Sequence, residues 1–190
     1  MSNEGTDSAK RRFKHARLSS SRSIRLLDLQ PSNNFDHPIN VELLETSLDN
    51  GPTKQSSYEA LSYVWGSQSG THRIICDEKS LFVTPNCESA LRYLRLKDRN
   101  RILWIDAICI DQTNSAEARL ERNAQVASMG EIYVKADCTL CWLGEGTAYT
   151  GEVMRRLEQI GSCPSQRGFA KLMDLEGSSL CLPSHDSPAY

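Results

Sequence analysis

Short apolar runs alternate with amphipathic stretches along most of this chain. The clearest run opens residues 103–112 and ends in a cluster of acids and amides. It is rich in β-branched and aromatic residues and too short for a buried helix, which predicts a strand covered on both faces. Similar runs predict strands at 58–66 and 138–143, and weaker ones at 24–29 and 39–43. Residues 73–76 and 81–83 fit a small hairpin.

Helical patterns separate the apolar runs. Thr84 and Pro85 form a favourable helix start, with threonine as N-cap and proline at the first helical position. Asn114 and Glu117 resemble a capping box that opens a long helix. The apolar stripe expected to face the sheet comprises Val126, Met129, Tyr133 and Ala136. Extended backwards, this stripe meets Arg119 and Arg122, which are expected to point towards the end of the strand at 103–112. A last helix follows Thr150, with Val153, Leu157 and Ile160 facing inward.

Strands that alternate with helices predict an α/β fold with a central, largely parallel sheet flanked by helices, plus antiparallel strands and a hairpin. In parallel sheets, ligands bind beyond the carboxyl ends of the strands. Those ends are Trp65-Gly66, residues 106–112 and Gly144-Glu145. We therefore expect them to share one rim with the amino terminus of the long helix.

The chain divides into three parts. Residues 1–22 are polar and basic, with a serine run at 19–21, and cannot bury enough apolar area to fold, which predicts a disordered tail. Residues 23–160 are expected to form the domain. Residues 161–190 are poorly patterned and are expected to be a tail or a truncated extension. The basic cluster before the serine run also fits a nuclear address or a patch for an acidic partner.

Composition excludes several classes of function. A formal net charge of −2, with 24% charged residues, provides no field for nucleic acid or anionic lipid, so neither partner is expected. No apolar run is long enough to span a membrane. Most of the seven cysteines lie in apolar segments and are expected to be reduced, which favours a cytoplasmic location.

Each rim residue has two interpretations. Asp106 is either a structural carboxylate, tied by backbone amides or by Arg119 or Arg122, or a catalytic or ligand-contacting acid. Asp111 and Gln112 either stabilise a local turn or bind a ligand at the rim.

The aromatic and helical candidates are equally open. Trp65 and Gly66 either close a strand or provide a stacking surface for a ring. Glu121, Arg122 and Gln125 either form a solvated network along the helix or face the rim as an acid, an arginine and an amide.

A metal site is not expected. Cys138 and Cys141 are three residues apart on a predicted strand, so their side chains point to opposite faces and cannot share a metal or a redox turn. The four histidines lie in loops or tails, and no glycine-rich phosphate loop is present. Neither a bound metal nor a cofactor is therefore predicted.

Several long motifs together resemble the fungal HET (heterokaryon incompatibility) domain. They are YEALSYVWG at 58–66, LWIDAICIDQ at 103–112, ERNAQV at 121–126, Met129 with IY at 132–133, and WLG at 142–144. The resemblance spans roughly residues 24–145. It implies a role in nonself recognition, in which incompatible alleles trigger programmed cell death. The expected partners are other HET-domain or receptor-type incompatibility proteins, or a second copy of the chain.

The HET family is distantly similar to TIR domains, α/β modules of innate immunity that assemble or cleave NAD. This similarity implies a TIR-like or flavodoxin-like sheet, and an alternative function as a NAD-cleaving enzyme with NAD as substrate. Cleavage needs a carboxylate beside an oxocarbenium-like transition state. Glu145 and Asp106 are the candidate catalytic acids, and Glu152 is a further acid to test. A degenerate fragment without function is the third alternative, which cooperative unfolding would exclude.

Overall fold

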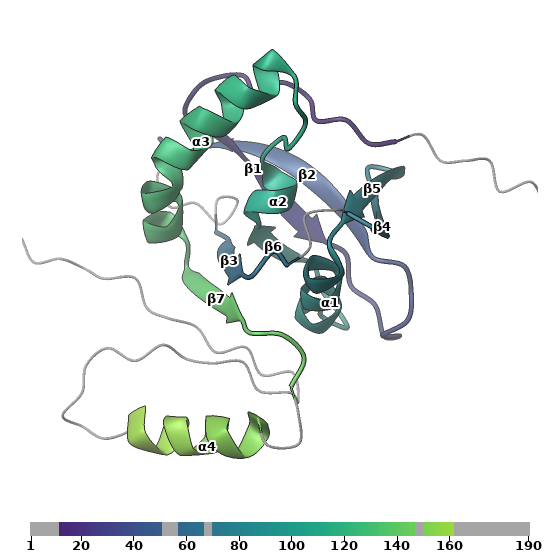
Figure 1. Ribbon diagram of the computed structural model, residues 1–190, viewed down its shortest axis with the longest axis vertical. Coiled ribbons are helices and arrows are strands. Elements are labelled where there is room, and N and C mark those ends of the chain that lie inside the picture. Colours follow the sequence, from purple (N-terminus) through teal and green to yellow (C-terminus); the bar gives the residue numbers. More distant parts are fainter. Residues whose placement is uncertain (1–11, 51–56, 67–69, 147–149, 162–190) are drawn as a thin grey trace, which may run out of the picture.

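One mixed sheet runs through the part of the chain that the computed structural model describes, residues 12–50, 57–66, 70–146 and 150–161. Helices α1, α2 and α3 lie on the same side of this sheet (Figure 1). The strands are β1 (Ser23–Leu29), β2 (Asn40–Ser47), β3 (Glu59–Tyr63), β4 (His72–Cys76), β5 (Lys79–Val83), β6 (Arg101–Trp104) and β7 (Cys138–Trp142). The helices are α1 (Pro85–Leu94), α2 (Asp106–Cys109), α3 (Ala116–Lys135) and α4 (Thr150–Gly161).

The prediction of an α/β fold is confirmed, but the prediction of a largely parallel sheet is wrong. The strand order is β5-β4-β2-β1-β6-β3-β7. Within the described sheet, β2–β4, β3–β6 and β3–β7 pair in parallel, and the other three pairings are antiparallel. Parallel neighbours need a crossover of a dozen or more residues. The connections from β1 to β2 and from β4 to β5 are shorter, so both pairs are antiparallel.

The central apolar run splits into two elements. Strand β6 ends at Trp104, and helix α2 begins at Asp106. The Asp106 carboxylate accepts a hydrogen bond from the Ala107 backbone N–H at 2.7 Å, which favours a helical turn at this point. The predicted strand therefore stops early, although its apolar residues Ile105 and Ile108 are completely buried.

Both helix starts that the sequence predicted exist, one of them shifted by a residue. Thr84 caps α1 by accepting a hydrogen bond from the Cys87 backbone N–H, with Pro85 next to it. Ser115, rather than Asn114, caps α3 by accepting from the Ala118 backbone N–H at 3.0 Å. Serine and asparagine are equivalent as caps, so the pattern could not choose between neighbours.

The buried face of α3 differs from the predicted stripe. Val126 is exposed, whereas the buried helical residues are Ala118, Gln125 and Ile132. Met129 and Tyr133 pack partly against the core, as expected. Gln125 is the buried residue here, with its amide bonded to the Ser23 carbonyl, and its neighbour Val126 faces outward. On α4, Val153 is also exposed instead of facing inward, and the side chains of Leu157 and Ile160 lie outside the described residues.

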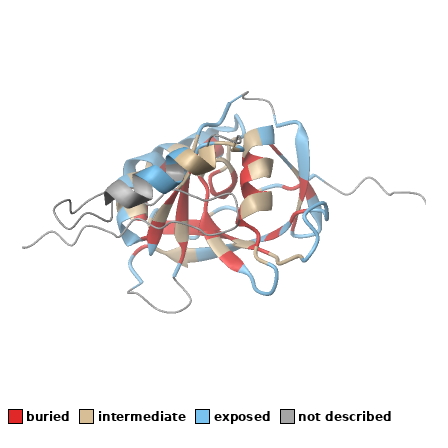
Figure 2. Ribbon diagram, turned by 90° about the horizontal axis from the view of Figure 1, so that it is seen from below, coloured by how far each residue is buried: buried red, intermediate tan, exposed pale blue. Residues whose placement is uncertain are grey.

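Residues 12–22, for which the sequence predicted a disordered tail, pack against the domain. Phe13 belongs to the core, and its backbone N–H donates to the Ser80 carbonyl at 2.8 Å. This N-terminal segment (residues 12–22) then runs across the domain to β1 (Figure 1). Residues 1–11 and 162–190 lie outside the described residues. Figure 2 shows that the buried residues concentrate in the strands and on the inner sides of the helices.

No described helix is both long and apolar enough to cross a bilayer. Cys76, Cys109 and Cys141 are free thiols, as expected from the sequence. Cys138 is instead disulfide-bonded, so the expectation that it is reduced is wrong.

Candidate functional site

Three parallel strands end at one rim of the sheet. Strands β6, β3 and β7 lie next to one another and run in the same direction. Their carboxyl ends lead into Asp106, Trp65 and Glu145, so the tertiary structure brings these predicted residues to the same edge. We call this edge the rim.

The centre of the rim is a hydrogen bond between Trp65 and Asp106. The indole Nε1 of Trp65 donates to both carboxylate oxygens of Asp106, at 3.1 Å each. Trp65 remains about a third exposed, at 36%. Burial raises the pKa of Asp106, and the hydrogen bonds from Ala107 and Trp65 offset only part of this effect. The partners of this carboxylate are therefore the Trp65 indole and the Ala107 backbone N–H. The expected backbone amide is present, whereas Arg119 and Arg122 are not its partners.

Helix α1 contributes side chains that the sequence did not single out. Asn86 accepts from the indole Nε1 of Trp142 at 2.9 Å and donates to the Val64 carbonyl at 2.5 Å. Ser89, on the next turn, donates to Glu145 at 2.7 Å. These bonds join the segments after β3 and β7. Two polar residues three apart on one helix face were the only signal in the sequence.

Buried polar groups lie beside the rim. The hydroxyl of Tyr63 and the indole N–H of Trp104 have no partner with hydrogen-bond geometry among the described residues. Burial raises the pKa of Tyr63, and the nearby Cys87 and Asp106 add to this effect. Buried donors without acceptors are uncommon in native structures. This part of the domain therefore carries more polar groups than its own hydrogen bonds use.

Gly66 turns the chain away from β3. Its φ of +70° is in the left-handed region, where residues with a Cβ atom are strained. The space around it is open, because a Cβ atom at this position would meet no atom within 4 Å. The backbone conformation, rather than crowding, therefore explains the glycine.

Asp111 and Gln112, although adjacent in sequence, contact two different parts of the domain. Gln112 belongs to the rim, because its amide donates to the Asp106 carbonyl at 3.1 Å and accepts from Arg122 at 3.5 Å. Asp111 faces the N-terminal segment, and its carboxylate lies 3.7 Å from the ring of His15. Its carboxylate also accepts from the Thr113 backbone N–H, which is a local turn contact.

Glu121 forms a buried ion pair instead of facing the rim. Its two carboxylate oxygens accept from Arg25 at 2.6 and 2.8 Å, and the side chains are only 15% and 5% exposed, respectively. Arg25 also donates to the carbonyls of Cys109 and Ala16, at 2.9 and 2.5 Å. Burial raises the pKa of Glu121, but hydrogen bonds from Arg25 and the Asp111 backbone lower it by more, so its net pKa is below the ordinary value.

Gln125 completes this second cluster. It is buried, and its amide donates to the Ser23 carbonyl at 2.9 Å. The predicted trio on α3 is therefore divided: Arg122 joins the rim, whereas Glu121 and Gln125 face β1 and the N-terminal segment. Glu121 and Gln125 therefore neither form a solvated network along the helix nor face the rim. Arg25 gave no sequence signal, because a charged residue in a strand ordinarily faces solvent.

No group of three or more histidine, cysteine or acidic side chains is arranged to hold a metal within the described ranges. The rim instead offers hydrogen-bond donors, an aromatic surface and two acids. Such groups can hold a polar ligand with a ring, or contact another protein.

The α/β domain with this polar rim belongs to the heterokaryon incompatibility (HET) family. The family's sequence profile matches residues 58–178, most of the chain. The chain is also similar to heterokaryon incompatibility protein 6, OR allele, of Neurospora crassa, with 34% identity over 151 residues. That alignment covers 73% of this chain and 21% of the relative, so the chain spans about a fifth of the relative's length. No solved structure matches the chain.

Breaking the buried ion pair is expected to destabilise the domain strongly. Replacing Glu121 by glutamine leaves Arg25 as a buried charge without a counter-charge, which costs roughly 3–5 kcal/mol of unfolding free energy. The matched control is Glu152→Gln, which removes an exposed acid on α4 and should change stability far less. Urea denaturation measures the unfolding free energy of both variants. A loss below about 1 kcal/mol for Glu121→Gln would contradict the structural role of the pair.

The ion pair of Arg25 and Glu121 also predicts that the unfolding free energy depends on pH. Because the pKa of Glu121 is lowered by folding, its contribution is present above the pKa of the unfolded glutamate and is lost as the pH falls through the folded value. Glu121→Gln should therefore lose less stability than wild type on acidification below about pH 4. Urea denaturation at a series of pH values measures the difference. Parallel stability curves for the two proteins would show that Glu121 does not titrate with folding.

Replacing Trp65 by phenylalanine is expected to raise the pKa of Asp106 further. The indole N–H stabilises the charged carboxylate, so its removal favours the protonated form. Carboxyl-carbon NMR titration measures this change. Leu143→Ala, which alters an exposed residue beyond β7, should leave the pKa of Asp106 unchanged. An equal or lower pKa in the Trp65→Phe variant would show that the indole does not stabilise the carboxylate.

Proposed function

We propose that this chain is a nonself-recognition module of heterokaryon incompatibility, which triggers fungal programmed cell death by assembling with a protein partner. The partner is another HET-domain or receptor-type incompatibility protein, or a second copy of the chain. Membership of the HET family and the name of the Neurospora crassa relative support the incompatibility role.

The observation that carries the protein-contact part of this proposal is the outer face of α3. Leu120, Val126 and Val134 are 72%, 55% and 67% exposed on this helix. Ala127 and Gly130, also exposed, lie between them along the chain. An amphipathic helix normally presents polar side chains to water. Large apolar side chains on an outer face are typical of surfaces that contact another protein.

Introducing a charge on this face is expected to block assembly. Leu120→Glu should leave the fold intact, because the side chain is mostly solvent-exposed, but should place an unpaired carboxylate in the interface. Sedimentation velocity measures assembly of the purified chain, and co-purification measures binding to co-expressed HET-domain proteins. Expression in fungal cells then measures killing. We expect assembly and killing to be lost together.

The matched control is Leu143→Glu, which adds the same charge at an equally exposed residue, 70% exposed, beyond β7. This variant should assemble and kill like wild type. If Leu120→Glu still kills cells while remaining monomeric and binding no partner, the assembly mechanism is wrong.

We propose NAD cleavage of TIR type as the alternative function. The observation that favours it is the rim, where Trp65, Asp106 and Glu145 follow neighbouring parallel strands. Trp65 offers a surface for a ring, and an acid can stabilise the positive charge of the transition state. Among the described residues, Glu145 accepts from Ser89 through one oxygen, whereas both oxygens of Asp106 accept from Trp65. Glu145 is therefore the first candidate acid.

Nicotinamide release from NAD, followed at high protein concentration, tests the alternative. If the chain is an enzyme, Glu145→Gln should reduce turnover by at least about a hundredfold, and the remote Glu131→Gln should not. Variants of Asp106 and Glu152 follow if Glu145 is not essential. Absence of nicotinamide release by the assembled wild-type chain would exclude this function.

A further inference from the structure

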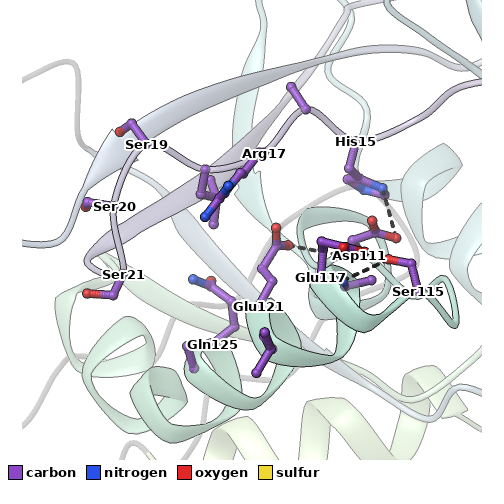
Figure 3. Close-up of a pocket in the computed structure, with 15 residues that line it drawn as sticks. His15, Arg17, Ser19, Ser20, Ser21, Asp111, Ser115, Glu117, Glu121 and Gln125 are labelled. Carbon is purple, nitrogen blue, oxygen red and sulfur yellow. Dashed lines mark hydrogen bonds and ion pairs between the residues drawn. The ribbon is translucent and has the colours of Figure 1, made fainter.

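A cavity of about 750 Å³ lies between the N-terminal segment and the first turns of α3. Residues 15–21 form one wall, and residues 115–125 of the α3 region form the other (Figure 3). This cavity is separate from the rim residues Trp65, Asp106 and Glu145, none of which lines it. One residue of the proposed assembly face, Leu120, also lines the cavity, but the function proposed above does not use the cavity as a ligand site.

The α3 wall presents a column of hydrogen-bond acceptors. Glu117, Glu121 and Gln125 are four residues apart, so they share one face of the helix, and all three line the cavity. Eight residues of helix rise by roughly 12 Å. Figure 3 shows Glu121 and Gln125 extending from α3 towards the N-terminal segment, with Glu117 beside Ser115 at the start of the helix. A long ligand can therefore contact all three in turn.

Gln125 carries the argument for a ligand. Its side chain is almost completely buried, at 2% exposure, and its amide nitrogen donates to the Ser23 carbonyl. That bond fixes the orientation of the amide and leaves the acceptor Oε1 without a partner among the described residues. Buried acceptors in native structures are nearly always satisfied. Because Gln125 lines the cavity, an N–H or O–H group of a ligand held there is the candidate donor.

The charges around the cavity favour a cation. Three carboxylates line it, those of Asp111, Glu117 and Glu121, against the side chains of Arg17 and His15. Arg25 already neutralises Glu121 through their ion pair. Glu117 is exposed at the opening, where hydrogen bonds from its own backbone N–H and from Ser115 hold its pKa below the usual range and keep it charged. The cavity therefore has an anionic opening above a buried acceptor.

We infer that this cavity binds an organic cation with several N–H donors, one of which hydrogen bonds to Gln125 while another pairs with Glu117. The shared chemistry is an alkylammonium or guanidinium group. A free polyamine supplies it, and so does a lysine or arginine side chain of a basic peptide. The inference does not depend on the proposed function, because binding is measured without assembly or killing.

Isothermal titration of the full chain with spermidine, and separately with a short peptide containing lysine and arginine, tests the inference. We expect saturable binding of one ligand per chain for at least one probe. Glu117→Gln, which keeps the shape and removes the charge, should weaken binding about tenfold, since a charge-assisted hydrogen bond is lost. The control Glu152→Gln removes an equal charge from α4 and should leave affinity unchanged.

Gln125→Leu removes the buried acceptor and should further weaken binding of the probe. Because it also removes the bond to Ser23, its folding is checked by circular dichroism. If the leucine variant does not fold, Glu117→Gln, at an exposed residue, decides the inference. Tighter binding of spermidine than of the peptide identifies a free polyamine as the ligand source, and the reverse identifies a basic peptide. No saturable binding of either probe to folded wild type, or equal weakening by Glu117→Gln and Glu152→Gln, would overturn the inference.

Discussion

The buried ion pair of Arg25 and Glu121 is the interaction on which the arrangement of the domain depends. Arg25 lies on β1, and its guanidinium reaches the carboxylate on α3, the carbonyl at the end of α2, and the N-terminal segment. Four elements therefore meet at one side chain. Such a pair is tolerated only because nearly all its hydrogen-bonding groups are satisfied. Removing one partner is costly, because the other charge then remains buried alone.

Helix α2 connects the two polar regions of the molecule. Its first residue, Asp106, accepts from Trp65 at the rim, and the carbonyl of its last residue, Cys109, accepts from Arg25 beside the cavity. The helix is only one turn long, so its two ends cannot move independently. The rim and the cavity therefore adjoin the two ends of this single turn, although different residues form them.

The sequence located the rim correctly because strand ends follow from local patterns. Apolar runs that stop at Trp65, Asp106 and Glu145 were sufficient once strands β3, β6 and β7 were recognised. These three strands are also the parallel part of the sheet, where helical crossovers enforce direction. Caps such as Thr84 were equally predictable, since they depend on neighbouring residues only.

The sequence by itself determined the α/β class, most element positions and the HET family. Only the tertiary structure decided the direction of the remaining strands, since β1 pairs with β6 across more than 70 residues. It also decided which polar residues are buried. Arg25 and Gln125 look solvent-facing in a pattern of hydrophobicity, yet both are buried because their partners come from distant segments. Periodicity records which face is apolar, but it cannot record a hydrogen-bond partner that is remote in sequence.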